Sequence, residues 1–219
     1  MDDSIDTTNL NINKVKNRFL PLTESVEKGL EREPKITDFE KISEIGNGSF
    51  GIVNLARHKV TKALYAIKQI SKLNKNNQEG KPYFRREIEI MYKVHHPNVV
   101  RLFSHFEDDQ NCYFVMEYVK RGDLFKQNTW KTNGKYRAEE VAKFMKDLIS
   151  AVYYLHNMDP PIIHRDIKPE NVLISESSEA KLTDVGWSNY INSEIRSTYC
   201  GTPVYLAPEM IKEIGHDEH

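Results

Sequence analysis

The stretch IIHRDIKPENVL (residues 162–173) constrains this chain most, because three chemically distinct side chains lie close together between two short apolar runs. Asp166, Lys168 and Asn171 offer a carboxylate, an ammonium group and an amide oxygen. A carboxylate can orient a hydroxyl nucleophile, an ammonium group can neutralise a transferring phosphoryl group, and an amide oxygen can bind a metal ion. Thirteen residues after Asn171, the segment TDVG supplies a second oxygen ligand for Mg²⁺, Asp184. The pattern predicts a phosphoryl-transfer site.

A glycine cluster, IGNGSFGIV (residues 45–53), fits the pattern G-x-G-x-x-G-x-V. Alone, this pattern also suits an ordinary hairpin. The flanking segments DFEKISEIG and GIVNLARH have the alternation of strands, whereas the glycines of a dinucleotide site open a helix. The cluster therefore favours a hairpin whose backbone N–H groups cover a triphosphate.

Lys68 ends the apolar run ALYAIK, and a lysine there needs an anionic partner because burying an unpaired ammonium group is costly. Two partners are open: phosphate oxygens, and Glu87 of the helix predicted over YFRREIEIMYKV (residues 83–94). Glu87 shares its helix face with apolar residues and is expected to point inward. The alternative is that Glu87 pairs only with Arg85 or Arg86.

The pattern of strands and helices divides the chain into three parts. Residues 1–37 are polar and are expected to form a flexible tail. Residues 38–119 predict five strands and one helix, and residues 120–219 turn helical, so we expect an α+β fold with two lobes. The segment AEEVAKFMKDLISAVYYLH (residues 138–156) predicts a long buried helix. Its apolar face would comprise Val141, Phe144, Met145, Leu148, Ile149 and Val152.

Composition excludes several classes of function. The net charge of −1 gives no basic excess for binding nucleic acid or an anionic membrane. The acidic start MDDSIDTTNL does not resemble a signal peptide, and no apolar run approaches the roughly 18 residues that span a bilayer. Cys112 and Cys200 lie far apart and form no metal-type pair, which favours the reducing cytosol or nucleus.

Taken in order, IGNGSFGIV, AIK, the helix glutamate, HRDIKPEN, DVG and APE resemble the motif series of eukaryotic protein kinases over residues 38–219. The motif HRDIKPEN, with Lys168 in it, resembles the loop of serine/threonine kinases rather than that of tyrosine kinases. DVGWSN, RSTYCGTP and the terminal HDE resemble the Aurora family.

The resemblance implies a bilobal kinase fold that transfers the γ-phosphoryl group of Mg-ATP to Ser or Thr of protein substrates. It implies ATP and Mg²⁺ as cofactors, and basic residues N-terminal to the target. It also implies a mitotic or cytoskeletal role, in the cytoplasm, nucleus, spindle, centrosome or cilium.

The resemblance further assigns roles to single residues. Lys68, paired with Glu87, would hold the α and β phosphates, Asp166 and Lys168 would serve the transfer, and Asn171 and Asp184 would bind Mg²⁺. Met116 would be the gatekeeper, Glu117 and Val119 would offer backbone groups to the adenine, and Leu173 would lie beneath it. Asp123 would reach the ribose, and Glu170 is a further implied contact. The residues that would cover the nucleotide are Ile45, Gly46, Asn47, Gly48, Ser49, Phe50, Gly51, Val53 and Ala66. Asp123 and Glu170 would also attract a substrate arginine, because opposite charge fixes register.

Thr198 matches the activation phosphosite of the family, and Arg196 precedes it by two residues, which suits self-phosphorylation by a kinase that prefers arginine there. A phosphate there would carry about −1.5 to −2 charges and would pair with Arg165 of HRD, ordering the loop. The alternative is an exposed loop threonine with no such role.

Two features depart from the family pattern. Val185 replaces the phenylalanine of DFG, and the smaller side chain predicts a looser contact with His164, at a cost of about 1–3 kcal/mol, but no lost catalytic atom. The sequence also stops at HDE, where the family continues into further helices, so the second lobe is expected to be incomplete. The apolar face of residues 141–152 and Leu173 would then lose much of their cover, and Glu209 would lack its usual arginine.

Three interpretations of that ending stay open. The chain is a fragment, or an interaction protein that binds nucleotide with little catalysis, or an active kinase whose second lobe is covered by a partner protein.

Overall fold

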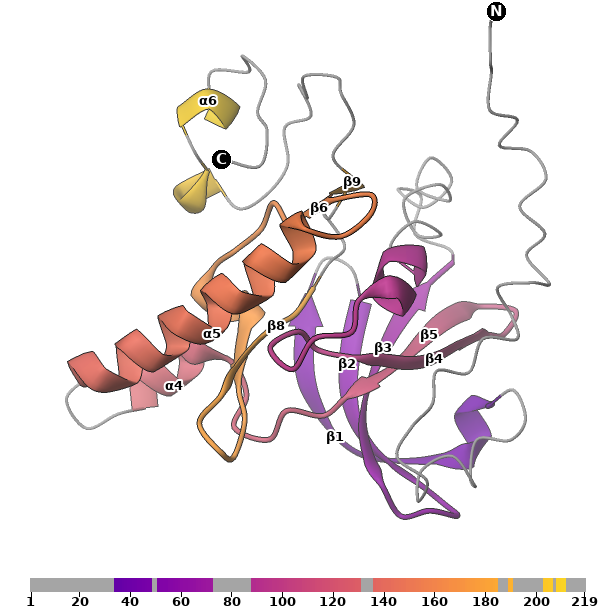
Figure 1. The fold of residues 1–219 in the computed structure, drawn as a ribbon. Helices are drawn as coiled ribbons and strands as arrows, with labels where there is room; N and C mark the ends of the chain where they lie inside the picture. Colours follow the sequence, from indigo (N-terminus) through magenta and orange to yellow (C-terminus); the bar gives the residue numbers. More distant parts are fainter. Residues whose placement is uncertain are drawn as a thin grey trace, which may run out of the picture.

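A five-stranded antiparallel sheet forms the first lobe, with the spatial order β1-β2-β3-β5-β4 (Figure 1). The strands are β1 (Phe39–Gly48), β2 (Gly51–His58), β3 (Leu64–Ser71), β4 (Leu102–Glu107) and β5 (Asn111–Glu117), and a short 3-10 turn, η2 (Ile36–Asp38), precedes them. The structure is a computed structural model that describes residues 34–48, 51–72, 88–130, 136–184, 189–190, 203–206 and 208–211. The sheet confirms the five predicted strands.

The central strands β3 and β5 are buried on both faces. Successive side chains along each strand point to opposite faces of the sheet, and each face packs into a different core. On one face, Tyr65 and Ile67 join an aromatic cluster that includes Phe39 and Phe106. On the other face, Ala66 joins a larger core that continues through residues 88–94 into the second lobe. This larger core therefore connects the sheet with the second lobe.

Residues 88–93 are helical and lie between β3 and β4 in the chain. Ile90 is fully buried, and Ile88, Met91 and Val94 are nearly so, because their spacing puts them on the face toward the sheet. The helical residues end ahead of His96-Pro97, where the sequence predicted an end.

The second lobe is mainly helical. Its elements are α4 (Leu124–Trp130), α5 (Ala138–His156), β6 (Ile162–Ile163), η3 (Pro169–Asn171), β7 (Val172–Ile174), β8 (Ala180–Leu182), β9 (Asn189–Tyr190), η5 (Pro203–Tyr205) and α6 (Pro208–Ile211). β7 pairs with β8 and β6 pairs with β9. α5 packs against β8 and β6, and Figure 1 shows it as the longest helix drawn in colour. In the described part of the chain, no helix has both the length and the apolar character to cross a membrane.

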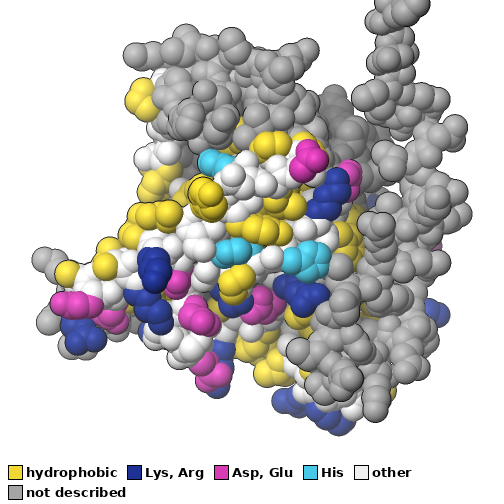
Figure 2. All heavy atoms as spheres, viewed as in Figure 1, with side chains coloured by type: hydrophobic (Ala, Val, Ile, Leu, Met, Phe, Trp, Pro, Cys, Tyr) yellow, Lys and Arg dark blue, Asp and Glu magenta, His cyan; other side chains and the backbone are white. Residues whose placement is uncertain are grey.

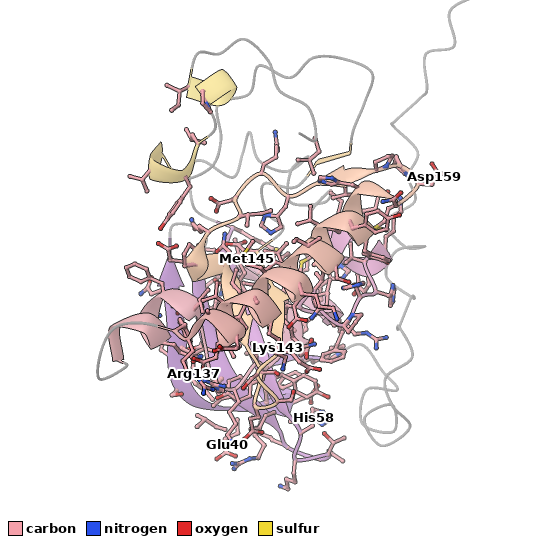
Figure 3. The ribbon with its side chains drawn as sticks, turned by 60° about the vertical axis from the view of Figure 1, so that its left-hand side comes forward. Glu40, His58, Arg137, Lys143, Met145 and Asp159 are labelled. Atoms are coloured by element: carbon pink, nitrogen blue, oxygen red, sulfur yellow. The ribbon has the colours of Figure 1, made fainter. Side chains whose placement is uncertain are left out.

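α5 is only partly buried, which corrects the prediction of a buried helix and agrees with the expectation that its apolar face loses much of its cover. Phe144 is buried and Leu148 packs against the core, but Val141, Met145 and Ile149 are 44, 49 and 62% exposed. β8 and β6 are the elements that α5 contacts most, and they leave these three side chains exposed. Figure 2 shows hydrophobic side chains along α5, and Figure 3 shows Met145 and Lys143 on different sides of the helix.

The two lobes are joined behind the site by backbone hydrogen bonds. Leu182 N–H donates to the Asn98 carbonyl at 2.8 Å, and Val100 N–H donates to the Leu182 carbonyl at 2.9 Å. The Asn98 side chain adds a bond from Nδ2 to the Ala180 carbonyl at 2.9 Å. The segment that leads into β4 is therefore fixed to β8, which carries the chain into Asp184.

Candidate active site

The loop between β6 and η3 begins at His164, a fully enclosed side chain with 2% exposure. Its Nδ1 accepts a hydrogen bond from Asp166 N–H at 3.3 Å, so Nε2 carries the proton and donates to the Thr183 carbonyl at 3.0 Å. Burial lowers the pKa of His164, which keeps the ring neutral. The neutral ring links the loop to the segment that carries Asp184.

Asp166 is buried and held by two neighbours. Asn171 Nδ2 donates to both the backbone carbonyl and Oδ2 of Asp166, at 2.8 and 2.9 Å. Lys168 Nζ lies 2.9 Å from the same Oδ2. The three residues predicted from the loop are therefore in direct contact, and the carboxylate is fixed in one orientation before any substrate hydroxyl approaches.

The amide of Asn171 has its nitrogen committed to Asp166, so its oxygen is the atom that can bind a cation. Its backbone carbonyl accepts from Thr183 N–H at 2.9 Å, which brings Asp184 next to the loop. In the described residues, no group of three or more His, Cys, Asp or Glu side chains could hold a metal ion alone. This donor set fits Mg²⁺, which is commonly held by one or two protein oxygens together with substrate phosphates.

Lys68 of β3 reaches Asp184, with Nζ 3.1 Å from Oδ1. Burial alone would raise the pKa of Asp184, but the charge and hydrogen bond of Lys68, with His164 and Lys168 nearby, hold it below the usual value. Asp184 is therefore ionised at neutral pH, as a metal ligand must be. The sequence had offered phosphate and Glu87 as partners of Lys68, and did not anticipate this pair.

The β1–β2 hairpin brings the glycine cluster over β3. Gly48 pairs with Gly51, and Val53 pairs with Lys68 on the neighbouring strand. Gly51 has a φ of 137°, and an added Cβ would lie 2.1 Å from the Gln69 carbonyl oxygen. Only glycine fits where β2 begins, because its backbone lies directly on β3.

Several residues predicted to contact the adenine come together around one apolar region. Ala66, Met116 and Val119 are buried in the same core, and Val53 and Leu173 pack against it. Ala66 and Met116 are paired across β3 and β5. Ile45 of β1 is 38% exposed and is not part of this core.

Glu117 ends β5, and its backbone N–H donates to the Arg101 carbonyl at 2.9 Å. Its carboxylate forms an ion pair with Lys181 of β8, with Nζ 2.8 Å from Oε1. Sequence reasoning missed Lys181. The signal was available, because this lysine stands between Ala180 and Leu182, two fully buried residues, and needs an anionic partner as Lys68 does.

Asp123 pairs with Leu173 of β7 in an isolated β-bridge, and Glu170 lies in η3, directly before β7. Asp123 caps α4, with Oδ1 accepting Lys126 N–H at 2.7 Å and Oδ2 lying 3.1 Å from Lys126 Nζ. Glu170 keeps a buried carboxylate oxygen, Oε2, that has no hydrogen-bond partner within the described ranges. Burying an acceptor without a donor costs free energy.

The remaining predicted site residues are Arg165 and several residues outside the described ranges. Arg165 has a left-handed backbone with φ of 67°. Glu87, Ser49, Phe50, Val185 and Thr198 lie outside the described residues, as does the side chain of Glu209. The roles assigned to them stay predictions.

Residues 39–219 match the protein kinase domain family. The match covers most of the chain, and the chain belongs to this family. It is 39% identical to Aurora kinase B-A of Xenopus laevis over 188 residues, which cover 86% of this chain and 51% of that protein. It is 40% identical to an Aurora kinase of Schizosaccharomyces pombe, over 85% of this chain and 52% of that protein, and 38% identical to one of Dictyostelium discoideum, over 84% and 47%. The chain spans about half the length of these curated relatives.

Proposed function

We propose that this chain carries the nucleotide-binding and phosphoryl-transfer residues of an Aurora-like serine/threonine protein kinase. The observation that carries the proposal is the contact of Asp166 with both Lys168 and Asn171, next to an ionised Asp184 paired with Lys68. The family match supports a kinase, and the similarity to Aurora kinases supports the serine/threonine type.

In the proposed reaction, the substrate hydroxyl donates a hydrogen bond to Asp166, which Asn171 and Lys168 hold in place. The hydroxyl oxygen bonds to the γ-phosphorus of ATP, the bond from that phosphorus to the β–γ bridging oxygen breaks, and ADP leaves. The hydroxyl proton passes to Asp166. Lys168 neutralises charge on the transferring group, since its ammonium already lies at the carboxylate.

Asn171 and Asp184 are the proposed holders of Mg²⁺, which when bound neutralises the phosphate charge. Because Lys68 Nζ lies 3.1 Å from Asp184, phosphates gathered at this carboxylate would be within reach of the lysine. The proposed roles of Glu87 with Lys68, and of the backbones of Glu117 and Val119 at the adenine, follow from the family motifs.

The proposed substrates are proteins with a basic residue N-terminal to the target Ser or Thr. The carboxylates of Glu170 in η3 and of Asp123 at the start of α4 support this preference, because opposite charge would attract a basic residue. The similarity to Aurora kinases favours mitotic substrates at the spindle or centrosome. Phosphate on Thr198, paired with Arg165, is the proposed activating switch.

The exposed Val141, Met145 and Ile149 favour a second candidate, a nucleotide-binding interaction protein with little catalysis. Calorimetry of ATP binding with and without Mg²⁺, together with transfer to a peptide carrying arginine two residues before serine, separates the two. A kinase binds Mg-ATP and phosphorylates this peptide better than one with glutamate there, and Glu170→Gln reduces the preference. Binding without transfer identifies the interaction protein.

A further inference from the structure

Three basic side chains contact the turn that joins β7 to β8 (residues 175–179). Lys120 Nζ lies 2.5 Å from Glu176 Oε1, and Lys143 Nζ donates to the Ser177 carbonyl at 3.0 Å. Arg121 Nη1 donates to Ser178 Oγ at 2.8 Å. Lys143 comes from α5, where Figure 3 labels it, and the other two follow β5, so the turn lies between two basic segments.

The three serine hydroxyls of this turn have different surroundings. Ser175 Oγ and Ser177 Oγ lie 2.9 Å apart, and both donate to Glu179 Oε2, at 3.3 and 2.7 Å. A phosphate on either would face that carboxylate. Ser178 Oγ instead meets the guanidinium of Arg121, which makes it the favourable place in this turn for a negative group.

The guanidinium is already positioned. Arg121 Nη2 donates to Gln127 Oε1 at 3.2 Å, and Gln127 Nε2 donates back to the Arg121 carbonyl at 2.6 Å. Arg121 N–H also donates to the Ile174 carbonyl at 3.2 Å. Because hydrogen bonds fix both its backbone and its side chain, Arg121 would lose little further conformational entropy on binding a phosphate. The N–H donors of a guanidinium group also match the geometry of phosphate oxygens.

The local charges leave room for an anion. Three cations contact the turn, against the carboxylates of Glu176 and Glu179. Hydrogen bonds from the Ser177 and Ser175 hydroxyls, with the charges of Lys181 and Lys143, lower the pKa of Glu179. Ser178 itself has a left-handed backbone with φ of 60°, and its N–H donates to the Ser175 carbonyl at 3.1 Å, so the backbone that carries the hydroxyl is fixed.

We propose that Ser178 is a phosphorylation site and that Arg121 binds the phosphoserine. In the modification, Ser178 Oγ bonds to the γ-phosphorus of ATP in the site of another protein kinase. The bond to ADP breaks, and the hydroxyl proton goes to the base of that enzyme. The donor is a separate kinase because Glu176, not an arginine, stands two residues before Ser178. This choice of donor rests on the proposed function, whereas the site does not.

The consequence is a tighter joint between the turn and the segment that follows β5. Gly122 N–H donates to the Val119 carbonyl at 3.3 Å, and Ile174 N–H donates to the Gly122 carbonyl at 2.9 Å, so Arg121 lies within a hydrogen-bonded segment that reaches β7. A phosphate that binds Arg121 would cross-link this segment to the β7–β8 turn.

Installing phosphoserine during expression tests the site in the full chain, with position 177 as the matched control. Phosphoserine at 178 is expected to raise the melting temperature by about 2 °C at low salt, since a fraction of a kcal/mol gives such a shift in a chain of this size. The rise should disappear with Arg121→Gln and shrink in high salt, because the contact is exposed. An equal rise from phosphoserine at 177, or a rise that survives Arg121→Gln, overturns the proposal.

Mass spectrometry of the protein isolated from its own cells tests whether the site is used. Trypsin gives the peptide DIKPENVLISESSEAK (residues 166–181), which contains all three serines. Fragmentation is expected to place phosphate on Ser178. Phosphate on Ser175 or Ser177 instead, or none across growth and division, overturns the proposal. Both readouts are independent of kinase activity, so a failed transfer assay leaves this inference standing.

Discussion

Lys181 of β8 and Glu117 at the end of β5 form an ion pair across the junction of the two lobes, with 2.8 Å between Nζ and Oε1. The side chains are 14 and 27% exposed, so water screens the pair only in part. A second oxygen of Glu117 lies 3.4 Å from Arg101 N–H. The pair thus adds a side-chain link to the backbone bonds between Asn98, Val100 and Leu182.

Lys181→Met is expected to lower the free energy of unfolding by about 1–3 kcal/mol, because it leaves the Glu117 carboxylate without its cation. The control is Lys93→Met, which removes an i,i+4 pair with Glu89 whose side chains are 42 and 45% exposed and should cost about 0.5 kcal/mol or less. Urea unfolding measures both. Equal losses would show that the Glu117–Lys181 pair is no stronger than a surface pair.

Gly51→Ala is expected to destabilise the chain by more than about 2 kcal/mol, because its Cβ would lie 2.1 Å from a backbone oxygen in a conformation that alanine avoids. Gly48→Ala is the matched control from the same hairpin, where no atom lies within 4 Å of the added Cβ, and should cost about 1 kcal/mol or less. Thermal melting compares the two. A tolerated Gly51→Ala would mean that β2 does not start against Gln69.

The buried His164 predicts a loss of stability in acid. Its pKa is lowered in the folded state, so the unfolded chain binds the proton more readily below the ordinary value of 6.5. The free energy of unfolding should therefore fall as pH drops below about 6.5. His96, whose pKa burial and Lys181 also lower, adds a change of the same sign.

Unfolding titrations at successive pH values measure this loss. His164→Gln keeps a donor for the Thr183 carbonyl and should flatten the slope below pH 6.5, leaving the part due to His96. Asp184 acts at lower pH: its lowered pKa means that its stabilising contribution disappears as pH falls below about 4. An unchanged slope in His164→Gln would show that the ring is not the neutral, buried group described here.

Asn171→Ala is expected to reduce kcat by about 100-fold and to raise the Mg²⁺ concentration that activity requires. The alanine removes both hydrogen bonds that hold Asp166 and one proposed metal ligand. Asn98→Ala, which removes an amide bond to the Ala180 carbonyl away from the Asp166 carboxylate, is the control for stability alone. Peptide phosphorylation against Mg²⁺ concentration measures both, and an unchanged Mg²⁺ requirement in Asn171→Ala would remove it from the metal site.

The sequence predicted the parts of this fold whose chemistry is local. The loop of Asp166, Lys168 and Asn171 was recognisable because all three lie within six residues, and the glycine hairpin because its glycines stand between strand patterns. The Lys68–Asp184 pair was not foreseen, because 116 residues separate its members and no local pattern connects them.

How far α5 is buried could not be predicted from its periodicity alone. Periodicity shows that Val141, Met145 and Ile149 share a face with Phe144, but it does not show which part of that face an element packs against. Lys181 was overlooked, although it also lies within an apolar run. The need for an anionic partner that was inferred for Lys68 therefore applies to Lys181 equally. The effect of Val185 and the switch at Thr198 stay predictions from the sequence.

The most direct test of the account is single-turnover transfer of the γ-phosphoryl group from Mg-ATP to an arginine-containing serine peptide, compared between the wild-type chain and Asp166→Asn. We expect transfer by the wild-type chain and a loss of at least about 100-fold in the variant, with nucleotide binding and melting temperature retained. Equal transfer by both proteins, or none by a wild-type chain that binds Mg-ATP, would contradict the assignment of this site to phosphoryl transfer.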